Sequence, residues 1–171
     1  MSGGSENCEQ RGRWLAIDLG DRRVGLAISD PSGTIASPVG FLDRRPGKRP
    51  PLTALLAKAT ELEARGFVIG LPLDGEGQDT PRAAEARRLA LELGQRTGLP
   101  ARLVDERFTT AQALRAIAEM EGSTRGRKGD VDAMAATMLL QHALRLHELS
   151  GAESASAKST GESEPEPDAN A

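Results

Sequence analysis

Three acidic residues stand where predicted strands end or a predicted helix begins: Asp18, Glu106 and Asp132. Asp18 closes a run of apolar residues, and Glu106 follows Asp105 after another such run. Asp132 comes soon after Asp130, at the start of the last predicted helix. In sheets that contain parallel strands, ligand sites gather beyond the carboxyl ends of those strands. The spacing therefore allows these side chains to meet at one end of a sheet.

Converging carboxylates would need a cation, because like charges held close together raise one another's pKa. An all-oxygen ligand set suits Mg²⁺ or Mn²⁺. The residues also allow a simpler interpretation, in which Asp18 caps a turn and Asp130 and Asp132 stabilise the start of a helix. On residue types alone, capping and ligation are equally weighted for Asp18, and capping is favoured for the other two.

The hydrophobic pattern predicts the elements that would hold these acids. An apolar run, a turn that contains Gly20 and a second apolar run predict a β-hairpin with a buried first strand. Pro38 places the third strand at a sheet edge, and the apolar strand after the first helix fits a central parallel position. Gly66 is expected to end the first helix, and Thr80 with Pro81 to begin the second. The predicted order has strands at 14–19, 24–29, 34–42, 67–71 and 101–105 and helices at 52–62, 81–93, 111–121 and 131–149. This order predicts an α/β fold with a mixed sheet between helices.

The composition indicates one folded domain with polar ends. The predicted division of the 171 residues is a disordered polar N-terminus (1–12), one domain (13–149) and a disordered acidic C-terminal tail (150–171) without large apolar residues. Five acids and one lysine give residues 151–171 a charge of −4, so the net charge of −3 leaves +1 on the rest. A nearly neutral body neither requires nor excludes a nucleic-acid partner.

The sequence shows no signal for a membrane or for export. No apolar run approaches the ~20 residues of a membrane span, and the N-terminus lacks the apolar core of a signal peptide. Cys8 is the only cysteine, so no intramolecular disulfide can form. We therefore expect a soluble, cytoplasmic protein with no membrane partner.

Four motifs taken together resemble one bacterial family. They are Asp18-Leu-Gly with Arg23-Val-Gly-Leu-Ala, Val68-Ile-Gly-Leu-Pro-Leu, Asp105-Glu-Arg-Phe-Thr-Thr and Asp132-Ala-Met-Ala-Ala. In order and spacing, over about residues 13–148, they resemble the YqgF family. Its members are RNase H-like nucleases, also called Holliday-junction-resolvase-like or pre-16S rRNA nucleases. Each motif alone is weak, whereas four in register are specific.

The resemblance implies an RNase H-like fold and a metal-dependent nuclease that processes the 5′ end of pre-16S rRNA during ribosome biogenesis. It implies Asp18, Glu106 and Asp132 as catalytic residues and metal ligands, with Asp105 and Asp130 as further candidate ligands. The implied cofactor is Mg²⁺ or Mn²⁺, as two ions, which would activate a water molecule and stabilise the leaving 3′ oxygen.

The sequence departs from the better-known Holliday-junction resolvases of this fold at the central strand. Those proteins end that strand on a carboxylate, whereas this chain has Gly70-Leu71-Pro72 there, so Glu106 must take its place. The alternative functions are a resolvase that acts on branched DNA and a nucleic-acid-binding protein without catalysis. An intact acidic trio opposes the second, because a pure binder gains nothing from acids that face phosphate. A homodimer is left open.

Basic residues near the motifs are predicted to hold the nucleic acid. Arg23 and Arg107 flank the acids and could hold the scissile phosphate through two hydrogen bonds each. Salt bridges that orient Asp18 or Glu106 are an equally weighted alternative for both. With few aromatic residues to stack on bases, binding by backbone and shape favours structured RNA or branched DNA. The predicted binding residues are Arg22, Arg23, Arg107, Thr109, Thr110, Arg125, Arg127 and Lys128.

Overall fold

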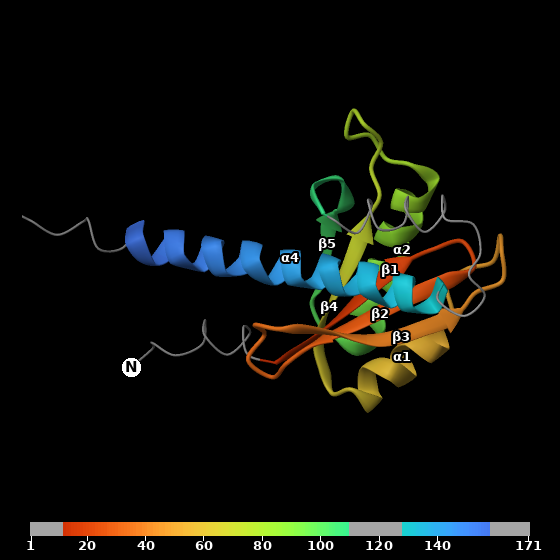
Figure 1. Cartoon of the computed structure of the whole chain (residues 1–171), viewed down its shortest axis with the longest axis horizontal. Coiled ribbons are helices and arrows are strands. Elements are labelled where there is room, and N and C mark those ends of the chain that lie inside the picture. The colour runs from red at the N-terminus through yellow and green to blue at the C-terminus, as the bar shows by residue number, and fades with distance from the viewer. Residues whose placement is uncertain (1–11, 110–127, 158–171) are drawn as a thin grey trace, which may run out of the picture.

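The computed structural model describes residues 12–109 and 128–157. The strands are β1 (Arg13–Leu19), β2 (Arg23–Ser29), β3 (Ala36–Asp43), β4 (Ala64–Leu71) and β5 (Ala101–Asp105), and the helices are α1 (Leu52–Glu61), α2 (Pro81–Thr97), the short 3₁₀ helix η1 (Glu106–Phe108) and α4 (Lys128–Ala157). The five strands form one sheet in the order β3-β2-β1-β4-β5. In Figure 1, α4 crosses in front of this sheet while α1 and α2 lie behind it. The predicted α/β fold with a mixed five-stranded sheet between helices is confirmed.

The first two strands form the predicted hairpin. β1 and β2 pair antiparallel with Asp18 opposite Gly25, and the Gly20 N–H donates to the Arg23 carbonyl across the turn at 2.9 Å. β3 continues the antiparallel pairing at the sheet edge, and its register shifts next to Pro38, which has no N–H to donate. Both predictions, the hairpin and the edge strand, are therefore confirmed.

The other half of the sheet is parallel. β4 lies between β1 and β5, with Ile17 opposite Ile69 and Leu71 opposite Asp105. Residues 66–71 of β4 are buried, as expected for a central strand covered on both faces. Because β1, β4 and β5 run in the same direction, their carboxyl ends meet at one end of the sheet. Asp18 and Asp105 both lie at this end.

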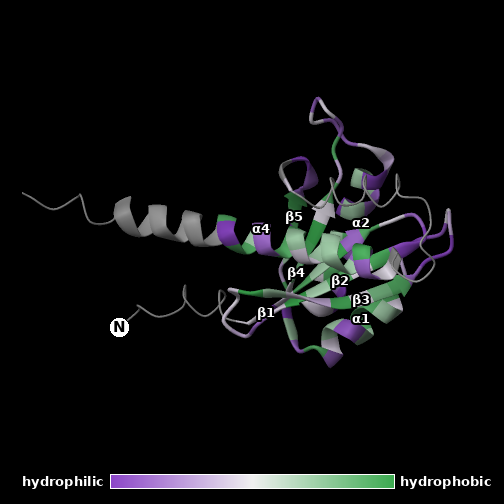
Figure 2. Ribbon diagram, viewed as in Figure 1, coloured by the Kyte–Doolittle hydropathy of each residue, from purple (hydrophilic) through white to green (hydrophobic). Residues whose placement is uncertain are grey.

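Alternate residues of each strand face two separate hydrophobic cores. Leu15 and Ile17 of β1 belong to the larger core, which includes buried residues of α1 and α2. Trp14 and Ala16 belong to the smaller core, which includes buried residues of α4. Figure 2 shows the hydrophobic residues concentrated in the central strands and the hydrophilic ones in the outer loops. Asp18 has the same parity as Trp14 and Ala16, so it faces α4.

The sheet face under α4 is lined by small residues. Ala16, Ala27, Gly25, Gly66 and Gly70 all lie on it by the alternation of their strands. A Cβ atom built on Gly25 would lie 2.1 Å from the backbone oxygen of Asp132, so α4 contacts the β2 backbone directly there. The small residues let the first turns of α4 approach the strand ends that carry the acids.

Three predicted boundaries differ in the structure. Gly66 does not end a helix: it lies inside β4, where a Cβ would be 2.5 Å from the Trp14 ring, and Glu63 makes the turn with φ 53°. α2 passes through Gly94 and ends at Thr97, followed by Gly98 in the left-handed conformation (φ 70°). α4 begins at Lys128, so Asp130 lies within its first turn, not before it.

The ends of the chain are only partly described. α4 continues to Ala157, so residues 150–157 are helical and do not belong to a disordered tail, which is where their composition predicts them. The predicted helix at 111–121 and the predicted disorder at 1–11 and 158–171 lie outside the described residues. The domain division itself stays a prediction.

Candidate active site

Two buried carboxylates lie on the α4 side of the sheet, at the carboxyl ends of its parallel strands. Asp18 is 2% exposed and Glu106 is 4% exposed. Asp18 is the residue after Ile17 in β1, and Gly70 is the residue after Ile69 in β4, so the two are neighbours across the pair. The Glu106 carboxylate lies over Gly70, because a Cβ built there would be 2.0 Å from Glu106 Oε1. The two acids thus occupy adjacent places on one face.

This arrangement explains the glycine at the end of the central strand. A side chain at Gly70 would fill the space that the Glu106 carboxylate occupies, and it would also lie 3.2 Å from Leu139 of α4. Glu106 follows β5 directly, in the first residue of η1, and its side chain reaches back over β4. The carboxylate at the end of β4 therefore belongs to Glu106, which follows the neighbouring strand β5.

The environment of Glu106 favours its neutral form. Burial raises the pKa of Glu106 from 4.5 to about 7, because water no longer solvates the charged carboxylate. The positive charge of Arg82 acts in the opposite direction, and the negative charge of Asp105 adds to the rise in this pKa. A bound cation would favour the charged form again.

Asp105 is engaged by its own neighbour. Arg107 Nε lies 3.1 and 3.0 Å from the two carboxylate oxygens, and its Nη2 lies 2.7 Å from Oδ2. The Arg107 backbone N–H also donates to Asp105 Oδ1 at 3.0 Å, which caps η1. These hydrogen bonds from Arg107 hold the pKa of Asp105 below its ordinary value. Of the two adjacent acids, Glu106 is the one whose carboxylate faces the buried site.

Asp132 approaches from α4. Its backbone packs on Gly25, which is the residue opposite Asp18, so α4 brings Asp132 to the same end of the sheet. Its carboxylate lies 3.9 Å from Nη1 of Arg23. Arg23 Nε also lies 3.9 Å from Asp43, and its guanidinium stacks 5.0 Å above the ring of Phe41. The acids that Arg23 contacts here are Asp132 and Asp43, whereas the salt-bridge alternative named Asp18 and Glu106.

Of the candidate metal ligands, Asp18 and Glu106 lie at adjacent places, but the described candidates do not form a complete ligand group. Among residues 12–109 and 128–157, no three Asp, Glu, His or Cys side chains are grouped so that they could hold a metal ion. Asp18 and Glu106 nevertheless offer carboxylate oxygens at adjacent buried places, a donor type that suits Mg²⁺ or Mn²⁺. Asp130 lies exposed in the first turn of α4.

Only some of the predicted nucleic-acid-binding residues can be placed relative to the site. Arg22 is exposed in the β1–β2 turn, beside the site. The Thr109 hydroxyl donates to the Glu106 carbonyl at 2.9 Å and closes η1. Lys128 is the first residue of α4. The remaining three predictions, Thr110, Arg125 and Arg127, lie outside the described residues.

One basic residue at the site, Arg82, was not predicted from the sequence. Arg82 lies in the first turn of α2, forms an ion pair with Asp21 of the β1–β2 turn, and is close enough to Glu106 to lower its pKa. A signal was present, because Thr80 and Pro81 predict a helix start just after the central strand. Residues in such a first turn lie at the carboxyl end of the sheet, where the acids are.

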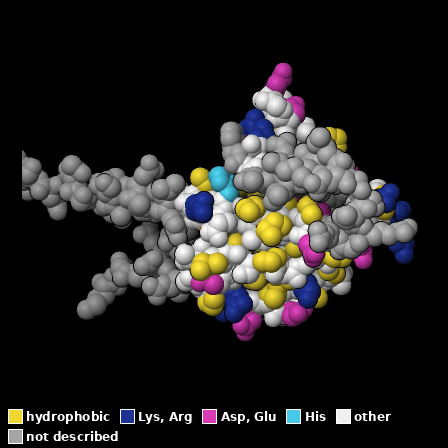
Figure 3. Space-filling view, in the orientation of Figure 1, with side chains coloured by type: hydrophobic (Ala, Val, Ile, Leu, Met, Phe, Trp, Pro, Cys, Tyr) yellow, Lys and Arg dark blue, Asp and Glu magenta, His cyan; other side chains and the backbone are white. Residues whose placement is uncertain are grey.

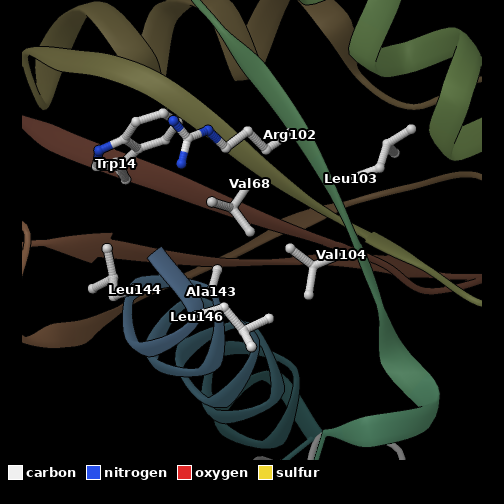
Figure 4. A pocket seen from close by; sticks show the side chains of 8 residues that line it. All are labelled: Trp14, Val68, Arg102, Leu103, Val104, Ala143, Leu144 and Leu146. Atoms are coloured by element: carbon white, nitrogen blue, oxygen red, sulfur yellow. The ribbon is translucent and has the colours of Figure 1, made fainter. Parts of the chain in front are cut away.

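A cavity of about 200 Å³ lies at the other end of the same sheet face, and it has a different character. Its lining is mostly apolar, and Arg102 stacks over the Trp14 ring at 4.6 Å (Figure 4). Figure 3 shows hydrophobic side chains gathered along the middle of the α4 side and charged ones around its margin. No carboxylate lines this cavity. The acids, and not this cavity, form the candidate active site.

The fold and the acids define a class of protein. The chain has the features of an RNase H-like protein with an acidic site. Its mixed sheet has the order β3-β2-β1-β4-β5, one buried acid lies at the end of β1, and another follows β5. The chain belongs to the RuvX family: the family model, described as a Holliday junction resolvase, matches residues 12–146. The family resemblance predicted from the four motifs is confirmed. None of the described helices is long and apolar enough to cross a membrane.

Curated relatives cover most of the chain. A protein of Clavibacter michiganensis subsp. michiganensis named "Putative pre-16S rRNA nuclease" is 40% identical over 140 residues, which are 82% of this chain and 87% of that protein. A protein of the same name from Koribacter versatilis is 42% identical over 130 residues, covering 76% and 84%. Among solved structures, Thermus thermophilus RuvC in complex with a Holliday junction substrate has a TM-score of 0.49 and 15% identity, and the match covers 80% of this chain and 96% of that one.

Proposed function

We propose that the chain is a metal-dependent nuclease that hydrolyses phosphodiester bonds in the 5′-end processing of pre-16S rRNA during ribosome biogenesis, in the cytoplasm. The observation that carries the proposal is the pair of buried carboxylates, Asp18 and Glu106, at adjacent places where parallel strands end. The names of the relatives support the reaction and the RNA substrate.

Burial of the acids favours catalysis over simple binding. A buried carboxylate is costly unless a cation or hydrogen-bond donors compensate its charge. Acids that face a phosphate would also weaken binding by repulsion. A protein that only binds nucleic acid would have no use for Asp18 and Glu106 at this place, whereas a nuclease needs them to hold a cation.

The residues divide into two roles. Mg²⁺ or Mn²⁺ would activate a water molecule and stabilise the leaving 3′ oxygen. Asp18 and Glu106 would hold this cation through their carboxylate oxygens, and Asp132 would complete the set from α4. Arg23, which lies 3.9 Å from Asp132, would then meet the phosphate.

The test compares wild type with Asp18→Asn on a pre-16S rRNA fragment, with Mg²⁺ or Mn²⁺. Asparagine keeps the size of the side chain but removes a charged ligand, so cleavage should fall by orders of magnitude while RNA affinity stays equal or rises slightly. Glu61→Gln is the control, because it removes one charge from the end of α1, on the other side of the sheet. Wild type that binds RNA but cleaves it with neither metal would contradict the proposal.

Metal binding can be measured without turnover. Isothermal titration with Mn²⁺ should show binding by wild type that Asp18→Asn and Asp132→Asn each weaken. The melting temperature of wild type should rise with Mn²⁺, because a ligand that binds only the native state stabilises it. Identical titration curves for wild type and both variants would contradict the assignment of the metal ligands.

Branched DNA is the second candidate substrate, because the matching family model is described as a Holliday junction resolvase. The same enzyme preparations should be given a four-way DNA junction under the same conditions. Cleavage of the junction at a higher kcat/KM than the rRNA fragment would favour this second candidate.

A further inference from the structure

A groove lies between the loop before α1 and the outer side of α2, outside the candidate active site. Its volume is about 410 Å³, and its lining combines charged and apolar side chains: Arg49, Pro50, Leu52, Glu85, Arg88, Leu89, Glu92, Gln95 and Arg96. Leu89 and Leu52 pack on the larger core, so the groove opens on the side of the sheet that carries α1 and α2.

The charge in the groove is mostly positive and uncompensated. Arg49, Arg88 and Arg96 form no ion pair with another described residue. Glu85 is already neutralised, because Arg44 Nη2 lies 2.5 Å from its Oε1. Only Glu92 then remains against three guanidinium groups. A concave site with this balance attracts an anion.

The groove is structurally linked to the end of the sheet that carries the acids. Arg44, which fixes Glu85 at the groove, also donates its backbone N–H to the Arg22 carbonyl at 2.8 Å. Its guanidinium donates to the Gly20 carbonyl at 3.2 Å, in the turn that follows Asp18 in the chain. Two further hydrogen bonds from Arg44 to the Lys48 carbonyl, 3.0 and 2.7 Å, hold the loop in shape. Arg44 therefore joins the turn after Asp18 to the groove.

We propose that this groove binds backbone phosphates of the nucleic acid whose cleavage site lies at Asp18 and Glu106, so the inference rests on the proposed function. Planar guanidinium groups present paired donors that match phosphate oxygens. Arg88 and Arg96 are eight residues apart on α2, about two helical turns, and so line one side of the helix. This spacing suits two separate phosphates of an extended strand better than one small anion.

The test measures RNA binding in EDTA, so that no cleavage is needed. A fluorescein-labelled RNA stem–loop with a single-stranded tail is titrated by anisotropy with wild type, with R88Q/R96Q and with the control R65Q/R145Q. The control removes the same two charges from exposed positions in β4 and α4, where Arg65 and Arg145 also have no described ion pair. All three proteins should have the same melting temperature, because the substituted side chains are exposed.

The groove variant should bind about ten-fold more weakly than the control, and the slope of log K against log salt should fall by roughly 0.7–0.9 for each lost phosphate contact. Equal affinities and slopes for the two double variants would overturn the proposal. A groove variant that changes oligomeric state by sedimentation while binding RNA like the control would overturn it as well, and would assign the groove to a second copy of the chain.

These outcomes are separate from those for the proposed function. If wild type binds RNA through the groove but cleaves no substrate, the groove assignment stands and the nuclease assignment fails. If wild type cleaves RNA and the groove variant binds and cleaves like the control, the nuclease assignment stands and the groove assignment fails.

Discussion

At the scale of single residues, Gly70 and Glu106 share one place in the structure. The carboxylate of Glu106 fills the space above Gly70, beside Asp18, and burial there raises its pKa to about 7. Each residue therefore constrains the other: a side chain at Gly70 would expel the carboxylate, and without the carboxylate the space would be a cavity.

Gly70→Ala should impair the site without unfolding the protein. The new Cβ would lie 2.0 Å from Glu106 Oε1, the end of a flexible side chain, so the carboxylate must move. We expect weaker Mn²⁺ binding, a large loss of cleavage, and a loss of stability of about 1–3 kcal/mol. Gly75→Ala is the matched control, because a Cβ there meets nothing within 4 Å. Equal Mn²⁺ titrations of the two variants would show that Glu106 is not held over Gly70.

The raised pKa of Glu106 predicts a pH dependence of stability in metal-free buffer. The folded protein holds this proton up to about pH 7, whereas the unfolded chain releases it near pH 4.5. The contribution of Glu106 to the free energy of unfolding is therefore fully present below pH 4.5 and is lost as the pH rises to about 7. Its size is about 1.4 kcal/mol for each unit by which the two pKa values differ. Asp79 and Asp105, whose pKa values are lowered, change the stability only at pH values below this range.

Thermal melts of wild type and Glu106→Gln across this range test the sign. Glutamine cannot ionise, so the melting temperature of the variant relative to wild type should increase as pH rises. Glu76→Gln, in an exposed loop, should follow wild type at every pH. A difference between wild type and Glu106→Gln that stays constant with pH would mean that the pKa of Glu106 is not raised.

At the scale of elements, the sequence predicted the strands and missed how they pack. The hairpin, the edge strand with Pro38 and the order of elements follow from local periodicity and turn chemistry, so they were predictable. Gly66 was wrongly predicted to end a helix, because the ring of Trp14, far away in the sequence, is what leaves no room for a side chain there. At Gly25 the backbone of α4 leaves no room for a side chain. These contacts are between residues far apart in the sequence, so local sequence patterns cannot predict them.

The same limit applies to the site. Asp18 was predictable because it ends an apolar run, and Asp105 and Glu106 were predictable as a pair because they follow another such run. The choice of Glu106 over Asp105 depends on which carboxylate Arg107 engages, and the ion pair between Arg82 and Asp21 joins two different elements. Neither follows from spacing along the chain.

Gly25→Ala and Gly94→Ala should have opposite effects, because one glycine is required by packing and the other is not. A Cβ on Gly25 would lie 2.1 Å from the backbone oxygen of Asp132, so α4 would have to shift, and we expect a loss of about 1–3 kcal/mol. Gly94 lies inside α2, where a Cβ would be 3.7 Å from its nearest atom, and alanine should stabilise the helix by about 1 kcal/mol. Urea unfolding of both variants gives the two free energies. A stable Gly25→Ala protein with normal activity would mean that α4 does not lie against β2.

At the scale of the whole molecule, the sheet separates two electrostatic surfaces. The α4 side carries the buried acids at one end, and the α1–α2 side carries the groove with Arg49, Arg88 and Arg96. Arg44 connects the two around the end of the sheet. A nucleic acid that binds both the acids and the groove, as we propose, would have to bend around this end.

The acidic C-terminal residues should weaken nucleic-acid binding through charge alone. Residues 158–171 carry four acids and one lysine, a net charge of −3, and no large apolar side chain that could join a core. Deletion of these residues, after the end of α4 at Ala157, should tighten RNA binding modestly, most at low salt, and leave the melting temperature unchanged. A full-length variant with the four acids changed to Gln or Asn should show the same gain, which separates charge from length. A fall in melting temperature on deletion would show that the tail packs on the domain, and tighter binding by the deletion but not by the neutralised variant would show that it blocks the surface sterically.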